Sequence, residues 1–370
     1  MEREVKIIAL YLPQFHETPE NNTFWGKGFT DWVTIKKAKP LFHGHAQPNV
    51  PLNNNYYDLS SKEALKWQID LAKKYGIYGF GIYHYYFSDN VQALTKPCEI
   101  LLRSPELDMP FFFIWDNGSW KRTWSKMAGN DWAPVEDAEQ SITREKGSDL
   151  LLEFVLGNEL NWKKHFEYLL PYFKDGRYMK MRNKPMFGII GYSKQMANMA
   201  AYWNRIAPQY GFDGVHIIYK YNPYRTRNTD LSTYYYEPHH VAWESIFALV
   251  KRRLFAKFNV KPKLSIFDYD DIWHKLLSEA ENDSNPNRCL GAFVGYDDTP
   301  RRGKLGKVVW GASPAKFENY FRKLIEIANR QKKEYVFLTA WNEWGEGAYV
   351  EPDEINQYAY LEAIKKVMEE

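Results

Sequence analysis

Short apolar segments alternate with longer amphipathic segments along most of the chain. The apolar segments are rich in β-branched and aromatic residues and predict strands at residues 6–12, 77–83, 111–115, 186–190, 215–219, 233–236, 290–294 and 335–338. The segment 233–236 is the least regular, and residues 264–267 are an alternative for its place. Eight strands with helices between them predict a closed parallel sheet, the (β/α)8 barrel.

Five segments place apolar residues three and four positions apart, as in a helix with one buried face. They lie at residues 62–75, 162–172, 202–207, 272–281 and 316–331, and Pro314 marks the start of the last. No Gly/Ser-rich or proline-rich linker interrupts the pattern, and no fixed-period repeat is present. We therefore expect one (β/α)8 domain over residues 1–370, with long loops at 13–59 and 130–157 on the catalytic face.

Aromatic residues are unusually frequent: 14 Trp, 27 Tyr and 22 Phe make up 17% of the chain. Most of these rings are expected in the core, and the remainder would provide flat faces on which sugars stack. The 49 basic and 46 acidic residues nearly balance, which argues against a nucleic-acid partner or an anionic membrane surface. Lys251, Arg252, Arg253 and Lys257 form a basic cluster that we interpret as a solvated helix face.

Neither a metal nor another cofactor is expected. Cys98 and Cys289 are too few for a disulfide framework or a cysteine zinc site. The histidine pairs at 43/45 and 239/240 lack the spacing of known metal sites, and no phosphate-binding glycine motif is present. No segment is long and apolar enough to span a membrane. Residues 1–6 lack the profile of a signal peptide, which predicts a cytoplasmic protein; the oligomeric state stays open.

Two carboxylates directly follow the last predicted strand, in the run 341–347, whose sequence is Trp-Asn-Glu-Trp-Gly-Glu-Gly. A barrel enzyme keeps its acid and base at this end of its strands, and paired carboxylates are what glycosidic bond chemistry requires. Glu343 and Glu346 are therefore the catalytic candidates, and the walls of Trp341 and Trp344 would raise a carboxyl pKa. The alternative is that either glutamate caps a helix or pairs with a basic residue.

Other strand ends and loops supply candidate sugar-binding side chains. The polar and tyrosine candidates are Tyr83, His84, Tyr85, Asp116, Asn117, Asp297, Asp298, Arg301 and Asn342. His84 would bond a sugar hydroxyl or belong to the core. The tryptophan candidates for stacking are Trp25, Trp32, Trp115, Trp120 and Trp124, besides Trp341 and Trp344, and plain core packing is the alternative for each.

Several motifs in order along the chain resemble the WbsX-like domain. They are Tyr-Leu-Pro-Gln-Phe-His at 11–16, Trp-Gly-Lys-Gly-Phe-Thr-Asp-Trp at 25–32, residues 37–48, 75–80 and 83–87, Asp-Thr-Pro-Arg-Arg at 298–302, and the run 341–347. This domain is similar to glycoside hydrolase family 99, which includes endo-α-mannosidases and endo-α-mannanases. The resemblance covers nearly the whole chain and implies a (β/α)8 barrel that acts with retention on an α-linked, mannose-like glycosidic bond.

The resemblance also implies roles for the two glutamates. Glu343 would take the proton of the substrate's 2-hydroxyl, so that this oxygen displaces the leaving group and forms a 1,2-anhydro sugar. Glu346 would protonate the leaving oxygen and then activate the incoming water or alcohol. WbsX-like proteins are commonly assigned to surface-polysaccharide assembly, so the competing hypothesis is a nucleotide-sugar-dependent glycosyltransferase. Arg301, Arg302 and Lys304 would then hold the diphosphate.

The chain departs from the family pattern at two places. After the third strand the family commonly has Trp-Ala-Asn-Glu-x-Trp, whereas this chain has Trp-Asp-Asn-Gly-Ser-Trp at 115–120. The usual carboxylate is thus absent at Gly118, and Asp116 offers one from a neighbouring position. Asp297 and Asp298 replace the more usual Asp-Asn pair. Both differences affect expected sugar subsites, so the sugar identity and linkage do not follow from the sequence.

Overall fold

Eight parallel strands close into a barrel in the computed structural model, which describes residues 5–121, 150–227, 230–244 and 264–370. The strands are β1 (Lys6–Tyr11), β2 (Ile77–Ser88), β4 (Phe111–Trp115), β8 (Lys184–Ile189), β9 (His216–Lys220), β10 (Thr233–Tyr234), β12 (Arg288–Phe293) and β14 (Tyr335–Thr339). They follow one another around the barrel in chain order, and β1 closes the ring by pairing with both β2 and β14. The predicted (β/α)8 barrel is confirmed.

Each of the eight predicted strand segments overlaps one barrel strand, and β2 continues five residues beyond its predicted end. The irregular segment 233–236 supplies only a two-residue strand, β10, which pairs with β9 and β12. The alternative segment forms β11 (Ser265–Asp268), which pairs with β13 (Lys307–Trp310) in a separate two-stranded sheet outside the barrel. The first choice for the sixth strand is therefore confirmed.

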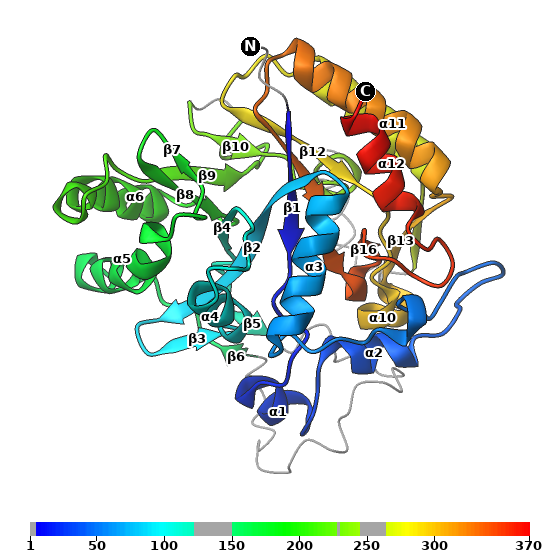
Figure 1. Ribbon diagram of the computed structural model, residues 1–370, viewed down its shortest axis with the longest axis horizontal. Coiled ribbons are helices and arrows are strands. Elements are labelled where there is room, and N and C mark those ends of the chain that lie inside the picture. The colour runs from blue at the N-terminus through cyan, green and yellow to red at the C-terminus, as the bar shows by residue number, and fades with distance from the viewer. Residues whose placement is uncertain (1–4, 122–149, 228–229, 245–263) are drawn as a thin grey trace, which may run out of the picture.

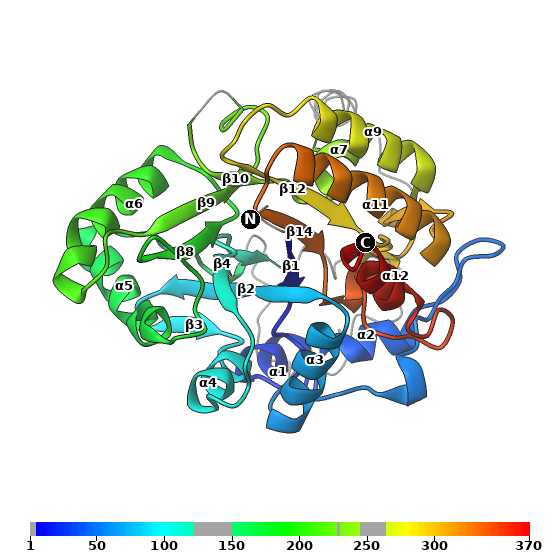
Figure 2. The same cartoon turned by 45° about the horizontal axis from the view of Figure 1, so that its top comes forward.

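Helices cover the outside of the barrel (Figures 1 and 2). They are α3 (Lys62–Lys74), α4 (Lys96–Arg103), α5 (Glu159–Lys174), α6 (Lys194–Ile206), α9 (Tyr269–Glu281), α11 (Pro314–Arg330) and α12 (Ala359–Met368). Pro314 is the first residue of α11, as predicted, and Ser313 caps that helix. Residues 202–207 predicted only the end of α6. The described residues between β9 and β10, 221–227 and 230–232, contain no helix.

The barrel interior is filled with large side chains. Tyr234 stacks on Phe337 with ring centroids 4.7 Å apart, and Phe112 meets the same ring edge-on at 6.0 Å. Helices bury the outer faces of the same strands, so β1 and β4 are apolar on both sides. Both faces of the strands are thus occupied by packed side chains, so the candidate site residues are expected on the loops at the strand ends.

The loops at the carboxyl ends of the strands gather at one end of the barrel, the lower end in Figure 1. After β1 come α1 (Pro19–Trp25), α2 (Asp31–Lys37) and the 3-10 turn Leu52–Asn54; after β2 comes β3 (Val91–Ala93), and after β4 come β5 (Trp120–Lys121) and β6 (Leu150–Leu152). After β10 comes α7 (His239–Ala242), after β12 come α10 (Thr299–Arg302) and the 3-10 turn Gly303–Leu305, and after β14 come β15 (Asn342–Glu343), the 3-10 turn Trp344–Glu346 and β16 (Ala348–Tyr349). The short strand β7 (Lys180–Met181) pairs with β8, and the 3-10 turn Ala207–Tyr210 follows α6.

Some predictions fall outside the described residues. These are Trp124, most of the loop 130–157, and the basic cluster Lys251, Arg252, Arg253 and Lys257. Where the structure describes the chain, no helix has the length and apolar character needed to cross a bilayer.

Candidate active site

The two candidate catalytic glutamates lie on a short turn that follows β14. In this catalytic turn, residues 341–349, β15 pairs with β16 around the 3-10 turn that carries Glu346. The Trp341 backbone N–H donates to the Leu10 carbonyl at 2.7 Å. The Asn342 side chain bonds both the N–H of Leu12, at 2.8 Å, and its carbonyl, at 3.0 Å. The turn is thus fixed to the end of β1, so Asn342 has a backbone-binding role in this structure.

A single buried arginine joins three carboxylates beside the turn. Arg301, on α10, donates from Nη1 to Glu346 Oε1 at 2.7 Å and from Nη2 to Asp31 Oδ2 at 2.6 Å. The same Nη2 lies 3.5 Å from Glu343 Oε2. Gln14 donates to the other oxygen of Asp31 at 2.7 Å. One guanidinium therefore links the β1 loop, the β12 loop and both candidate catalytic residues.

The backbone at Gly345 lies against the guanidinium of Arg301. A Cβ at this position would stand 2.6 Å from Arg301 Nε and 3.0 Å from Cζ, closer than real Cβ contacts. We expect Gly345→Ala to push Arg301 away from the glutamates and to lower kcat by roughly tenfold, because misplacing catalytic groups by fractions of an ångström is costly. Steady-state kinetics would measure this loss. The matched control is Gly176→Ala, where a Cβ meets nothing within 4 Å, and an equal loss there would contradict the explanation.

Glu343 has a strongly raised pKa. Burial raises the pKa of Glu343 to about 8, the negative charge of Glu346 adds to the rise, and Arg301 opposes it. Its side chain is 7% exposed, against 19% for Glu346, which makes the ion pair with Arg301. From the sequence we expected the tryptophan walls and a neighbouring carboxylate to raise the pKa of the general acid. The structure instead raises the pKa of Glu343, which the resemblance makes the base, and the carboxylates crowded around Arg301 contribute to the rise.

Tyrosine hydroxyls and a second charged cluster surround the glutamates. Tyr83 donates to the hydroxyl of Tyr236 at 3.2 Å, and burial, together with nearby carboxylates, raises the pKa values of Tyr83, Tyr85 and Tyr236. Burial raises the pKa of Asp116 to about 6, Lys220 opposes the rise, and Glu346 adds to it. Tyr83, Tyr85 and Asp116 thus lie in the electrostatic environment of the two glutamates, and the sequence had named all three as candidate sugar-binding residues.

Two predicted sugar-binding residues instead belong to the core on the helix side of the barrel. The Nε1 of Trp115 donates to the Tyr86 carbonyl at 2.9 Å, and the residue is 1% exposed. The Nε2 of His84 lies 2.9 Å from the Nε2 of His165 on α5, and burial lowers the pKa of His84 to about 3. Side chains alternate between the two faces of a strand, and both residues are on the outer face. His84 and Trp115 are therefore core residues in this structure, which was the alternative given for each of them from the sequence.

Three further tryptophans pack within or against the catalytic turn: Trp341 and Trp344 belong to it, and Trp32 contacts it from α2. Trp344 stacks on Tyr349 at 3.6 Å and contacts Trp32 at 5.6 Å, while Trp341 is fully buried beside Phe80. All three are buried, so they support the turn and offer no open face. Two predicted stacking residues remain partly exposed and keep that role as a prediction: Trp25, beside Phe29, and Trp120, at the edge of Tyr85.

The remaining polar candidates bind protein groups. The amide of Asn117 makes two hydrogen bonds with the backbone of Gly191, of 2.6 and 2.8 Å. Asp297 accepts from Gln47 Nε2 at 2.6 Å and contacts His45 Nε2 at 2.7 Å. Asp298 is buried and bonds Tyr296, Lys307 and Arg302. These side chains connect loops, so their predicted sugar contacts would require a change of partners.

The structure leaves room at the position where the family usually has a carboxylate. A Cβ on Gly118 would meet only Asp116 Oδ1, at 3.7 Å. The absent side chain therefore leaves space next to Asp116.

The histidine pairs contact carboxylates in this structure: His45 contacts Asp297, and His240 contacts Glu237. Within the ranges that the structure describes, no three Cys, His, Asp or Glu side chains are grouped to hold a metal ion.

Sequence reasoning missed four residues of the site. Asp31 was visible only as part of the motif at 25–32, and Lys220 and Tyr236 follow or end short strands that gave no further signal. Lys220 donates to Glu244 Oε1 at 2.9 Å. The fourth, Glu351, is buried behind the catalytic turn and hydrogen-bonded to Trp344. It is the next acidic residue after Glu346 in the chain, which was the available signal.

A family model described as glycosyltransferase WbsX matches residues 7–364. Among curated proteins, an uncharacterized protein WxcX of Xanthomonas campestris pv. campestris (strain B100) is 28% identical over 378 residues, covering 98% of this chain and 49% of that protein. The homologous WxcX of strain ATCC 33913 is also 28% identical, with the same coverages. The chain thus spans about half the length of the curated relatives it matches.

Solved structures with a similar fold include glycoside hydrolases. The GH99 endo-α-mannosidase from Bacteroides thetaiotaomicron is 12% identical with a TM-score of 0.54, covering 98% of this chain and 96% of the other. A structure described as a glycoside hydrolase-like protein is 13% identical with a TM-score of 0.59, covering 99% and 94%. At these identities the likeness establishes the barrel fold.

Proposed function

Because the chain belongs to the family described as glycosyltransferase WbsX, we propose that it is a carbohydrate-active enzyme that cleaves or transfers an α-linked, mannose-like glycosidic bond with retention. The observation that carries the proposal is the pair Glu343 and Glu346, which Arg301 joins at the carboxyl end of β14. Two carboxylates with different environments are the equipment for acid and base catalysis on a sugar.

In the proposed mechanism, Glu343 takes the proton of the 2-hydroxyl, and O2 forms a bond to C1. The bond from C1 to the leaving oxygen breaks, and Glu346 protonates that oxygen; the reactive state therefore has Glu343 ionised and Glu346 protonated, so Glu346 must exchange its ion pair with Arg301 for a proton. Glu346 then takes a proton from water or an acceptor alcohol, whose oxygen opens the 1,2-anhydro ring at C1 with return of a proton from Glu343 to O2. A hydroxyl is a weak acid, so the raised pKa of Glu343, about 8, makes its ionised form a better base than an ordinary carboxylate.

The second candidate is a nucleotide-sugar-dependent glycosyltransferase of surface-polysaccharide assembly, which the family's description favours. A diphosphate needs positive groups that are free to bind it. Here Arg301 contacts Asp31, Glu343 and Glu346, and Arg302 contacts Asp298. The excess of carboxylates around Arg301 would repel a diphosphate at this place, which argues for a neutral glycoside as substrate.

The test is incubation of the protein with defined α-linked oligosaccharides, with and without a mixture of nucleotide sugars, followed by mass spectrometry. Shortened chains that form without nucleotide sugar support the glycosidase. Chains that redistribute in length without nucleotide sugar support transglycosylation by the same site. Growth that strictly requires nucleotide sugar would contradict the proposal and favour the second candidate.

The pH dependence of kcat/KM distinguishes a base from an acid at Glu343. A glycosyl fluoride needs no acid in its first step, so on this substrate a base with a pKa of about 8 should make kcat/KM rise about tenfold from pH 7 to a plateau near pH 9. If Glu343 were instead the acid, kcat/KM on this substrate would not rise through that range, and the two roles would have to be exchanged. Circular dichroism at each pH would separate this titration from unfolding.

A further inference from the structure

A buried carboxylate that the proposed mechanism does not use lies directly behind the catalytic turn. Glu351 is 3% exposed. Its Oε2 accepts from Trp344 Nε1 at 2.6 Å and from the Tyr57 hydroxyl at 2.7 Å, and its Oε1 accepts from Gln68 Nε2 at 2.7 Å. The donors come from the turn, the β1 loop and helix α3. One side chain therefore joins three segments that are distant in sequence.

These three hydrogen-bond donors offset part of the free-energy cost of burying the Glu351 carboxylate. Burial raises the pKa of Glu351 to about 7, while the bonds from Trp344, Gln68 and Tyr57 oppose the rise. Without the carboxylate, an indole N–H, a hydroxyl and an amide would be buried with no acceptor, which is costly. The site is built for an acceptor with two oxygens.

The residues that Glu351 holds are the chain neighbours of Glu343. Trp344 follows Glu343 directly, and its ring is clamped between this hydrogen bond and the stack on Tyr349. Asn342 precedes Glu343 and donates to the Tyr57 hydroxyl at 3.4 Å. Glu351 thus fixes one neighbour directly and the other through Tyr57, and Glu346 lies two residues beyond Trp344.

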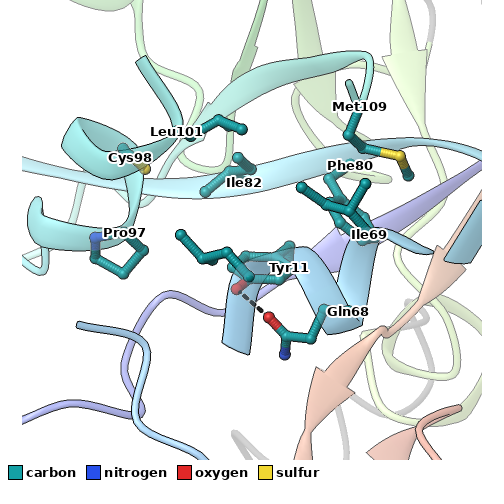
Figure 3. Close-up of a pocket in the computed structure, with 10 residues that line it drawn as sticks. Tyr11, Gln68, Ile69, Phe80, Ile82, Pro97, Cys98, Leu101 and Met109 are labelled. Atoms are coloured by element: carbon teal, nitrogen blue, oxygen red, sulfur yellow. Dashed lines mark hydrogen bonds between the residues drawn. The ribbon is translucent and has the colours of Figure 1, made fainter. Parts of the chain in front are cut away.

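The hydrogen-bond network continues from Gln68 on α3 to Tyr11 at the end of β1. Gln68 Oε1 accepts from the Tyr11 hydroxyl at 2.7 Å, as Figure 3 shows. Tyr11 ends β1, and both residues border an apolar cavity of about 20 Å³ between β2, α3 and α4. That volume holds about one water, so the cavity is no ligand site. The anchor of Glu351 is consequently the packed interface of β1 with α3.

We propose that Glu351 is a positioning residue, which holds Trp344 and, through Tyr57, Asn342, so that Glu343 and Glu346 keep their places relative to the substrate. The inference rests on the proposed function of the two glutamates. Its physical basis is that a catalytic group displaced by about 1 Å loses about 100-fold in rate. A purely structural role would instead lower the stability and leave turnover per folded molecule unchanged.

Three variants separate these roles. Glu351→Ala removes the acceptor, whereas Glu351→Gln keeps one oxygen for Trp344 and Tyr57 and can donate to Gln68 if that amide turns over. The matched control is Asp283→Asn, which alters another buried carboxylate, between Arg288 and Lys333 at the amino end of β12. The control should change stability and not turnover.

We expect Glu351→Ala to lower kcat per folded molecule by about 10- to 100-fold with KM within about twofold, and Glu351→Gln to recover kcat to within about fivefold of the unaltered protein. Hydrogen exchange followed by mass spectrometry should show lost protection at residues 342–347 in Glu351→Ala and unchanged protection in α11. If residues 342–347 stay protected, or if kcat per folded molecule is unchanged in Glu351→Ala, the inference is overturned.

The exchange measurement needs no substrate and so separates two failures. If the unaltered protein processes no glycoside, the proposed function fails, and lost protection at 342–347 still supports Glu351 as the residue that fixes the turn. Activity in the unaltered protein together with equal loss of turnover in Glu351→Ala and Asp283→Asn would overturn the positioning role and leave the proposed function standing.

Discussion

Glu343→Gln and Glu346→Gln are each expected to lower kcat by about 10²- to 10⁴-fold on a natural glycoside, because glutamine preserves shape and cannot transfer a proton. The fold should persist in both. At neutral pH, glutamine resembles the protonated form that burial favours at Glu343. The control is Glu326→Gln on the exposed surface of α11, which should leave kcat unchanged. Full activity in both glutamine variants would remove the basis of the mechanism.

Comparing substrates with good and poor leaving groups would show which glutamate is the acid and which is the base. A substrate with a good leaving group, such as a glycosyl fluoride, needs no proton from an acid, so Glu346→Gln should recover most of its rate in the first step. Glu343→Gln should stay slow on both kinds of substrate, because O2 still requires a base. The opposite pattern would make Glu343 the acid.

Arg301→Met is expected to destabilise the protein by about 3–5 kcal/mol, since it leaves buried carboxylates without their cation. Asp31 and Glu346 would lose partners at 2.6 and 2.7 Å, and the pKa of Glu343 would rise further because Arg301 now lowers it. Urea denaturation at pH 7 measures the free energy of unfolding. The activity rise with pH should move to higher pH in any folded protein that remains.

The neighbouring Arg302 provides the control for this experiment. Arg302 is 43% exposed and pairs with Asp298, which also has bonds from Lys307 and Tyr296. Arg302→Met should therefore cost about 1 kcal/mol or less. Equal destabilisation by the two substitutions would show that the contacts of Arg301 with three carboxylates contribute no more to the free energy of unfolding than the single ion pair of Arg302.

Stability should also decline with rising pH on account of Glu343. Its pKa in the folded protein, about 8, exceeds the value near 4.3 expected of an unfolded chain. The stability linked to this group is therefore full below about pH 4.3 and is lost as the pH rises through 8. Glu343→Gln removes this loss, so the variant should gain stability relative to the unaltered protein between pH 7 and pH 9.

The barrel strands were predictable because strands buried on both faces are continuous apolar runs. Even β10, with two residues, lay within its predicted segment. Helices were harder: α4 and α12 are short and were missed, and α6 was recognised only at its end. The local pattern of a short helix carries few repeats, so periodicity has little to detect.

The position of the two candidate glutamates after β14 was predictable, and the contacts around them were not. Glu343 and Glu346 follow a strand within one motif, whereas the ion pair of Arg301 with Asp31 joins residues 270 positions apart. Trp115 was placed at the correct strand end, whereas His84 lies within β2, which continues to Ser88; for both residues the sequence did not fix the face on which the side chain lies. A shift of one residue reverses the face of a strand side chain, and continuous apolar runs give no alternation to read.

The hydrogen bonds between the catalytic turn and the end of β1 make assembly of the site depend on a late step of folding. Leu12 and Asn342 are 330 positions apart, and they meet only when β14 has paired with β1. During synthesis, a polypeptide that has not reached β14 lacks both candidate glutamates and the residues that bind the end of β1. The candidate site is therefore complete only when β14 has closed the ring, so a measured turnover would report on ring closure more sharply than helix content does.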